Sequence, residues 1–141
     1  MALLVNGTHK VTFPSSVDYL DKVEAISVNV ASELGFSESD SDDLSISITE
    51  IFNNAVHHGN QEDPTKKVFI TFTRNEPYLI ISIQDQGPGF QPDEIKDPLA
   101  PENLLAENGR GIYLVRNLTD DLKINVTEQG TEILIYKKLP K

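Results

Sequence analysis

Three polar side chains near the middle of the chain have the chemistry and the spacing of a site. Glu50, Asn54 and His58 recur every four residues, with His57 as the alternative to His58, so a helix would stack them on one face. A carboxylate can act as a general base, and an amide oxygen can bind a hard metal ion. The competing interpretation is a solvated polar face. No Lys or Arg occurs from position 23 to 65, which favours a site, because solvated faces usually mix both signs of charge.

The helix that would position these side chains is predicted from Asp40 to Gly59. Asp40 and the serine and acids after it suit a helix N-terminus, where side-chain oxygens and negative charge are favourable. Gly59 is typical of a helix end. The apolar residues between these limits share a separate arc, which predicts the face that packs on the core: Leu44, Ile48, Ile51, Phe52 and Ala55.

Asp85 ends a predicted strand and is the second candidate for chemistry. Its parity follows Leu79, Ile81 and Ile83, so the side chain should point into the interior. A buried carboxylate without a donor costs several kcal/mol, so something must donate to it. A local turn could supply backbone N–H groups, and the amino group of a ligand could equally do so. The sequence leaves both interpretations open.

Two glycine pairs follow Asp85. Gly87 and Gly89 would let backbone approach a flat ligand, although Gly-Pro-Gly is also an ordinary turn. Gly109, Arg110 and Gly111 come directly before an apolar helical pattern that runs to Leu118. Free N–H groups at a helix start can bind phosphate, and a flexible hinge into the helix is the alternative. The spacing of a P-loop is absent.

The remaining patterns predict one domain, residues 1–141, that contains both strands and helices. A helix with purely structural packing is expected between Val17 and Leu34, and a long stretch without periodicity from Gln86 to Asn108. The strands alternate in polarity, so one sheet face should be covered and the other more open. We therefore expect an α/β (α+β) two-layer sandwich with a mixed, mostly antiparallel sheet and helices on one face. The predicted strands are one or two short strands within 3–13, followed by 67–74, 78–85, 122–127 and 131–138.

Composition excludes several classes of function. The 141 residues carry 22 acids against 12 Lys plus Arg, a net charge of −10, which argues against direct nucleic-acid binding and against anionic membranes. A protein partner, or a ligand that brings its own cations, fits better. There is no cysteine, so thiolate catalysis and disulfides are excluded. No apolar run approaches ~18 residues, and a cytoplasmic location is the default expectation.

The order of these motifs resembles the GHKL ATPase superfamily, which includes gyrase, heat-shock chaperone, histidine-kinase and mismatch-repair ATP sites. The matching boxes are Glu50 to Gly59, then Asp85 to Gly89, Gly109 to Gly111, and Gly130-Thr131 before Leu139-Pro140. The stretch TEIFNNAVHHGN further resembles bacterial anti-sigma regulatory factors that are serine-protein kinases. Histidine kinases need an upstream helix pair, whereas here a strand and one helix precede the first box.

The resemblance implies a Bergerat-type fold that binds ATP and Mg²⁺. Asp85 would accept a hydrogen bond from the adenine amino group, Thr131 would line that pocket, and Gly87 and Gly89 would let adenine approach. Asn54 would give its side-chain oxygen to Mg²⁺. Glu50 would be the general base for an incoming serine hydroxyl, and His58 would orient this box rather than act as a base. The phosphates would be held by Gly109, Arg110, Gly111 and Ile112, under a lid formed by residues 86–108.

The implied partners are a small antagonist protein phosphorylated on serine, a sigma factor and a second copy of the chain. Two departures from the family concern docking and the lid: the lid has no glycine between Gly89 and Gly109, and Glu107-Asn108 stands where relatives often have a basic residue. Two rival functions stay open. One is a nucleotide-dependent binding module without phosphoryl transfer, and the other is an interaction domain that binds no nucleotide.

Overall fold

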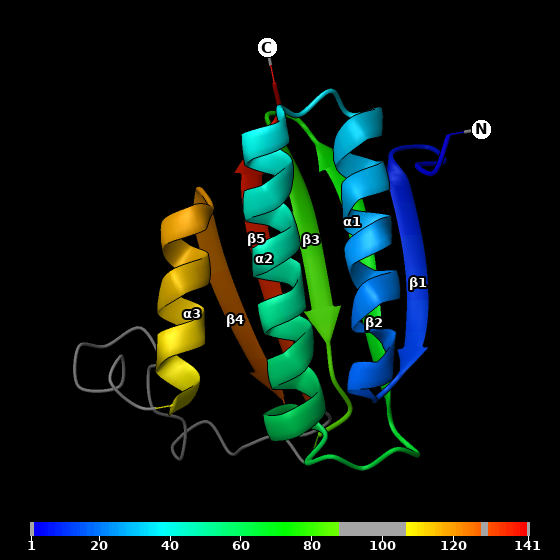
Figure 1. Cartoon of the computed structure of the whole chain (residues 1–141), viewed down its shortest axis with the longest axis vertical. Helices are drawn as coiled ribbons and strands as arrows, with labels where there is room; N and C mark the ends of the chain where they lie inside the picture. Colours follow the sequence, from blue (N-terminus) through cyan, green and yellow to red (C-terminus); the bar gives the residue numbers. More distant parts are fainter. Residues whose placement is uncertain (1, 88–106, 128–129, 141) are drawn as a thin grey trace.

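The computed structural model describes residues 2–87, 107–127 and 130–140 of the chain. They form one five-stranded sheet with the strand order β1-β2-β3-β5-β4 (Figure 1). The sequence predicted a mixed, mostly antiparallel sheet, and all four pairings in these residues are antiparallel. The strands are β1 (Thr8–Pro14), β2 (Lys67–Asn75), β3 (Tyr78–Gln84), β4 (Asp121–Thr127) and β5 (Gly130–Lys138).

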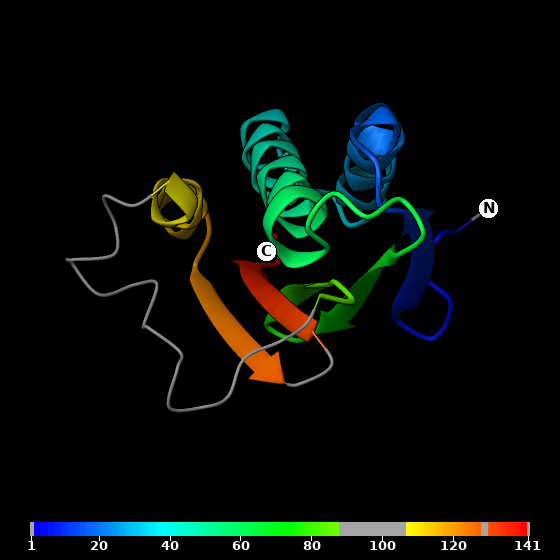
Figure 2. The same ribbon diagram turned by 90° about the horizontal axis from the view of Figure 1, so that it is seen from below.

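The helices lie together on one face of the sheet, as Figure 2 shows, which confirms the predicted two-layer α+β sandwich. Two of them are α1 (Leu20–Glu33), preceded by the short 3₁₀ helix η1 (Val17–Tyr19), and α2 (Glu38–Asn54). The chain of α2 continues into η2 (Ala55–Gly59), a single π-helical turn. The third is α3 (Glu107–Leu118). None of the helices in the described residues is both long and apolar enough to span a membrane.

The hydrophobic core lies between this helical layer and the sheet. The predicted apolar arc of α2 is buried there, and so are the inward residues of β2 and β3. Removing each such side chain from water stabilises the fold by about 1.5–3 kcal/mol. The core residues from these three elements are Leu44, Ile48, Ile51, Phe52, Val68, Ile70, Phe72, Leu79, Ile81 and Ile83, and Ala55 of the predicted arc is buried at the start of η2.

Two predicted helix starts are wrong by a few residues. Helix α2 begins at Glu38 rather than Asp40, because the hydroxyl of Ser37 accepts a hydrogen bond from the N–H of Asp40 at 3.1 Å and caps the helix. Helix α3 begins at Glu107, so Gly109 and Gly111 lie inside its first turns rather than ahead of it. Residues 88–106, which hold most of the predicted lid, lie outside the described residues.

None of the helices in the described residues lies on the opposite face of the sheet (Figure 2). Its central positions alternate with the core residues and are half-buried, among them Phe69, Ile80, Leu134 and Tyr136. Ile80 pairs with Tyr136 across β3 and β5, and the ring of Tyr136 meets Tyr78 edge-on at 5.8 Å between centroids. This face therefore combines apolar and polar side chains, in agreement with the predicted open side.

Candidate functional site

Asp85 lies directly after β3 and is 5% exposed, so the prediction that it points inward is confirmed. Its Oδ1 accepts hydrogen bonds from the N–H groups of Gly87 at 2.9 Å and Thr131 at 3.0 Å. Its own N–H donates to the carbonyl of Thr131 at 3.0 Å, which extends the pairing of β3 with β5 by one residue. The local turn supplies one of these two donors, Gly87, as the first of the two interpretations expected, and the distant strand β5 supplies the other.

Three glycines enclose Asp85 with bare backbone. A Cβ atom added to Gly59 would lie 1.9 Å from Oδ2 of Asp85, and one added to Gly130 would lie 2.3 Å from its carbonyl oxygen. A Cβ on Gly87 would lie 1.9 Å from the carbonyl oxygen of Gly59. Gly130 also has φ +149°, a conformation that L side chains rarely adopt. These positions require glycine because the carboxylate and the neighbouring backbone occupy the space of any side chain.

Burial raises the pKa of the Asp85 carboxyl above its ordinary value, while the N–H groups of Gly87 and Thr131 and the charge of Lys66 act in the opposite direction. The loss of hydration is the largest of these effects. Further N–H donation from a ligand would favour the charged form of this group. Asp85 is therefore suited to recognise a ligand amino group.

Glu50 and Asn54 project from the last turns of α2, one turn apart. Both side chains are half-buried. A Cβ atom on Gly111 of α3 would lie 2.1 Å from Oε1 of Glu50, so the carboxylate lies against the bare backbone of that helix. The Nδ2 atom of Asn54 is buried, and it makes no hydrogen bond to any described residue. A buried amide group without a partner is rare and suits a residue that binds something absent from the protein alone.

The two histidines lie in the π-turn η2. Nδ1 of His57 is 2.8 Å from the carboxylate of Glu62, and His58 is exposed and makes no hydrogen bond within the described residues. No hydrogen bond of His58 within the described residues supports its predicted role of orienting the helix end. The buried polar residue at this helix end is Asn60, which follows the predicted end of the helix at Gly59.

Asn60 is 0% exposed and bonds to three segments. Its Nδ2 donates to Oγ of Ser15 and to the carbonyl of Lys67, both at 3.0 Å, and its Oδ1 accepts from the N–H of Gln86 at 2.7 Å. One feature of the sequence could have indicated Asn60: after Asn54, it is a further amide side chain that directly follows the helix-ending Gly59. A regular α-helix would place that residue about 160° from Leu44 on the wheel, away from the core.

The predicted site residues form two groups at one end of the fold. Figures 1 and 2 show that α2 and β3 end, and α3 and β5 begin, at the same edge of the two layers. One group surrounds Asp85 and the other is centred on Glu50. Gly109 and Arg110 lie in the first turn of α3, the side chain of Ile112 packs in the core, and Gly89 lies outside the described residues.

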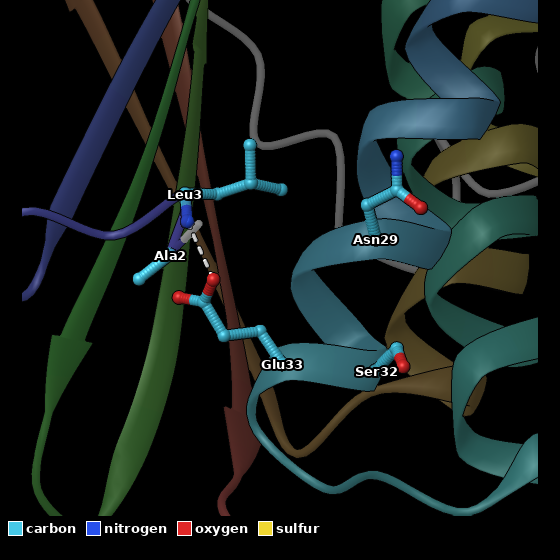
Figure 3. A pocket seen from close by; sticks show the side chains of 5 residues that line it. All are labelled: Ala2, Leu3, Asn29, Ser32 and Glu33. Carbon is cyan, nitrogen blue, oxygen red and sulfur yellow. Dashed lines mark hydrogen bonds between the residues drawn. The ribbon is translucent and has the colours of Figure 1, made fainter.

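A separate cavity of about 540 Å³ lies near the N-terminus (Figure 3). It is lined by Ala2, Leu3, Asn29, Ser32 and Glu33, and the Glu33 carboxylate accepts hydrogen bonds from the backbone N–H groups of Leu3 and Leu4. Glu33 ends α1 at the end of the layers opposite to Asp85 (Figure 1). This cavity is therefore not part of the candidate site.

The sequence of this chain is similar to those of known proteins. A family model described as histidine kinase-like ATPase domain matches residues 13–137. The serine-protein kinase RsbW of Bacillus mycoides (strain KBAB4) is 30% identical over 134 residues, which cover 91% of this chain and 82% of that protein. The serine-protein kinase RsbW of Oceanobacillus iheyensis is 31% identical over 130 residues, which cover 88% and 82% of the two chains.

Solved structures share the fold at lower identity. The RsbU and RsbW domains of a Mycobacterium tuberculosis protein superpose with a TM-score of 0.70 at 19% identity, covering 95% of this chain and 33% of that one. The histidine kinase domain of the blue-light activated histidine kinase of Erythrobacter litoralis EL346 gives a TM-score of 0.59 at 17% identity, covering 90% and 62%. At these identities the likeness concerns the fold alone.

Proposed function

This chain belongs to the histidine kinase-like ATPase domain family, and we propose that it is an ATP- and Mg²⁺-dependent serine-protein kinase that also acts as an anti-sigma factor. The observation that carries the proposal is the buried Asp85, held at the end of β3 between Thr131 and three glycines. The relatives named serine-protein kinase, matched over most of their length, support the kinase activity.

The nucleotide base is assigned to the group around Asp85. Oδ1 of this carboxylate already accepts two backbone N–H groups, and the adenine amino group would donate to the same carboxylate. Guanine carries a carbonyl oxygen at the corresponding position, which a carboxylate repels. Thr131 would line this pocket beside Asp85, and Gly87, whose N–H bonds to Asp85, would bring backbone close to the flat base. Gly89, assigned the same role, lies outside the described residues. The pocket therefore selects ATP over GTP.

The phosphates and the metal are assigned to the end of α2 and the start of α3. Asn54 would give its side-chain oxygen to Mg²⁺, which takes few protein oxygens and keeps waters and phosphate oxygens as its other ligands. Its buried Nδ2 is a donor without a partner among the described residues, so it is suited to donate to an oxygen of the bound nucleotide. Bound Mg²⁺ would neutralise phosphate charge. Gly109 and Arg110 stand in the first turn of α3, where free backbone N–H groups and the helix dipole favour phosphate. Gly111 and Ile112, assigned to the phosphates as well, follow in the next turn.

Glu50 is assigned the general base. The serine hydroxyl oxygen of the protein substrate attacks the γ-phosphorus of ATP, the bond from that phosphorus to the bridging oxygen breaks, and ADP leaves. Glu50 takes the hydroxyl proton as the new bond forms. The position of its carboxylate against Gly111 supports this role, because α3 also carries the residues assigned to the phosphates.

The partners follow from the same assignment. The phosphorylated protein would be a small antagonist of the anti-sigma activity. When this chain is not bound to the antagonist, it would instead hold a sigma factor. A second copy of the chain would cover the open sheet face, whose apolar side chains include Ile80, Leu134 and Tyr136. A kinase that uses ATP and binds a sigma factor acts in the cytoplasm, where both are found.

Incubation with γ-labelled ATP and a candidate antagonist from the same genome tests the kinase. Wild type is expected to transfer label to serine, and Glu50→Gln is expected to bind ATP with unchanged affinity but to transfer at least a hundredfold more slowly, the usual contribution of a general base being about 10²–10⁴-fold. Full activity of Glu50→Gln in sigma-factor release would instead support the rival binding module that transfers no phosphate.

A further inference from the structure

Three hydrogen bonds form a closed ring at the end of the molecule that carries Asp85. Nδ2 of Asn60 donates to the carbonyl of Lys67 at 3.0 Å, and the N–H of Lys67 donates to Oε1 of Gln86 at 2.8 Å. The N–H of Gln86 then donates to Oδ1 of Asn60 at 2.7 Å. This Asn60–Lys67–Gln86 ring joins the end of α2 to the start of β2 and to the segment after β3.

The local backbone is shaped to bring Asn60 into this ring. The π-turn closes with a hydrogen bond from the N–H of Asn60 to the carbonyl of Ala55 at 2.7 Å, so the last turn is wider than an α-turn. Two consecutive residues, Gln61 and Glu62, then take positive φ values of 53° and 61°. Positive φ is uncommon in residues other than glycine, and π-turns and such strain are both frequent at functional sites.

Gln86 is the residue between Asp85 and Gly87, so the ring acts on both. Asp85 is fixed on one side by the backbone of Thr131, whose carbonyl accepts from the N–H of Asp85 and whose N–H donates to Oδ1 of Asp85. The Asn60–Gln86 bond fixes the next peptide from the side of α2. Asn54, assigned to the metal, lies on that same helix end. The ring therefore sets the distance between the two parts of the site that are built on different elements.

We propose that Asn60 and Gln86 are positioning residues for the nucleotide, which hold the Asp85–Gly87 segment in the geometry that recognises the base. This inference rests on the proposed function, because it presumes that the base binds at Asp85. Packing alone does not account for Asn60, since a fully buried amide must find hydrogen-bond partners that an apolar side chain would not need. All the polar atoms of its side chain are used, and the one bond outside the ring goes to Ser15.

The test compares four variants of the full chain by calorimetric titration with Mg-ATP and with Mg-GTP, well below each melting temperature. Asn60→Ala removes two sides of the ring, and Gln86→Ala removes the bond from Lys67. Gln84→Ala is the matched control, because Gln84 is also an exposed glutamine but its side chain makes no hydrogen bond within the described residues. Ser15→Ala removes a bond of Asn60 and leaves the ring intact.

Asn60→Ala is expected to weaken ATP binding about tenfold and to reduce the ATP-over-GTP preference, while Gln86→Ala weakens ATP binding roughly threefold. Ser15→Ala lowers the melting temperature without changing either dissociation constant, and Gln84→Ala changes neither property. A merely structural role of Asn60 would lower the melting temperature and leave the base preference of the folded protein unchanged, as Ser15→Ala does.

Unchanged ATP affinity and base preference in Gln86→Ala and in folded Asn60→Ala would overturn the inference. If Asn60→Ala does not fold, Gln86→Ala against Gln84→Ala decides alone. Asp85→Asn separates this result from the proposed function: if it loses ATP binding while the ring variants keep it, only the positioning role is wrong. If wild type binds no Mg-ATP, both proposals are wrong.

Discussion

The carboxylate of Glu50 lies against the Cα atom of Gly111. The two residues belong to different helices, α2 and α3, and are far apart in the sequence. A Cβ atom at position 111 would be 2.1 Å from Oε1 of Glu50 and 2.9 Å from its carboxyl carbon. The absence of a side chain at Gly111 therefore determines where the proposed base rests. The carboxylate is the free end of a flexible side chain, so it can move away if this space is filled.

Gly111→Ala is expected to slow phosphoryl transfer about tenfold or more, because the new methyl group displaces the Glu50 carboxylate from its position. Stability should stay the same or rise by up to about 1 kcal/mol, since Ala is the better helix former. Kinase assays and chemical denaturation measure the two effects. On a Glu50→Gln background the same substitution should have no further effect on rate, and additive losses would contradict the displacement.

Gly59→Ala is expected to lower the stability of the fold, whereas Gly111→Ala leaves stability unchanged or raises it. Its Cβ would lie 1.9 Å from Oδ2 of Asp85, and this carboxylate is fixed by bonds from Gly87 and Thr131. The clash must be relieved by moving backbone, which costs roughly 1–3 kcal/mol of the free energy of unfolding. Urea denaturation of this variant beside Gly111→Ala gives the comparison, and equal stabilities of the two variants would refute it.

Asp85→Asn is expected to separate stability from binding. The folded pKa of Asp85 is raised, so between its unfolded and folded pKa values the folded state binds the extra proton, and stability falls as pH rises through that window, which begins near 3.8. Replacement by the neutral amide removes this contribution. Thermal melts should show that the variant without ligand is at least as stable as wild type at pH 7, while its melting temperature no longer rises with Mg-ATP.

Asn54→Ala is expected to remove the dependence of nucleotide binding on Mg²⁺. In wild type, chelation of Mg²⁺ should weaken ATP binding, and saturation with Mg-ATP at ~100 times Kd should add about 2.7 kcal/mol to stability. In the variant, ATP affinity should be the same with Mg²⁺ and with EDTA. Stability without ligand should hold, because the amide that is lost has no partner among the described residues. Retained Mg²⁺ dependence would exclude Asn54 as the ligand.

Lys137→Met tests a contact that ties α3 to α2 away from the site. Nζ of Lys137 donates to the carbonyl of Leu118 at 3.0 Å and lies 3.4 Å from a carboxylate oxygen of Asp40. This side chain is 13% exposed, so its loss should cost about 1–2 kcal/mol of the free energy of unfolding. Lys138→Met, at the neighbouring exposed position, is the control and should be near neutral. Equal effects in the two variants would contradict the contact.

The sequence by itself determined the two-layer arrangement of helices on a sheet and most of the faces that pack in the core. The periodicity of α2 and the alternation of β2 and β3 identified the core faces, because burial of apolar area dominates folding and leaves a regular pattern along the chain. The same parity placed Asp85 inside. Helix starts were less well determined: Ser37 and Asp40 are both good caps, and the hydrogen bond that selects Ser37 is visible only in the folded chain.

Tertiary structure alone decided how the site is enclosed. The glycines at positions 59, 87 and 130 meet around Asp85 from three segments, and Gly111 meets Glu50 from a fourth, so contacts across the fold exclude a side chain at each of them, and at Gly130 the local φ does so as well. Asn60 was missed for the same reason, because a π-turn departs from the regular wheel and turns it inward. Sequence periodicity reports which face of an element is buried, whereas the partners of a buried polar group depend on distances between elements that no local pattern records.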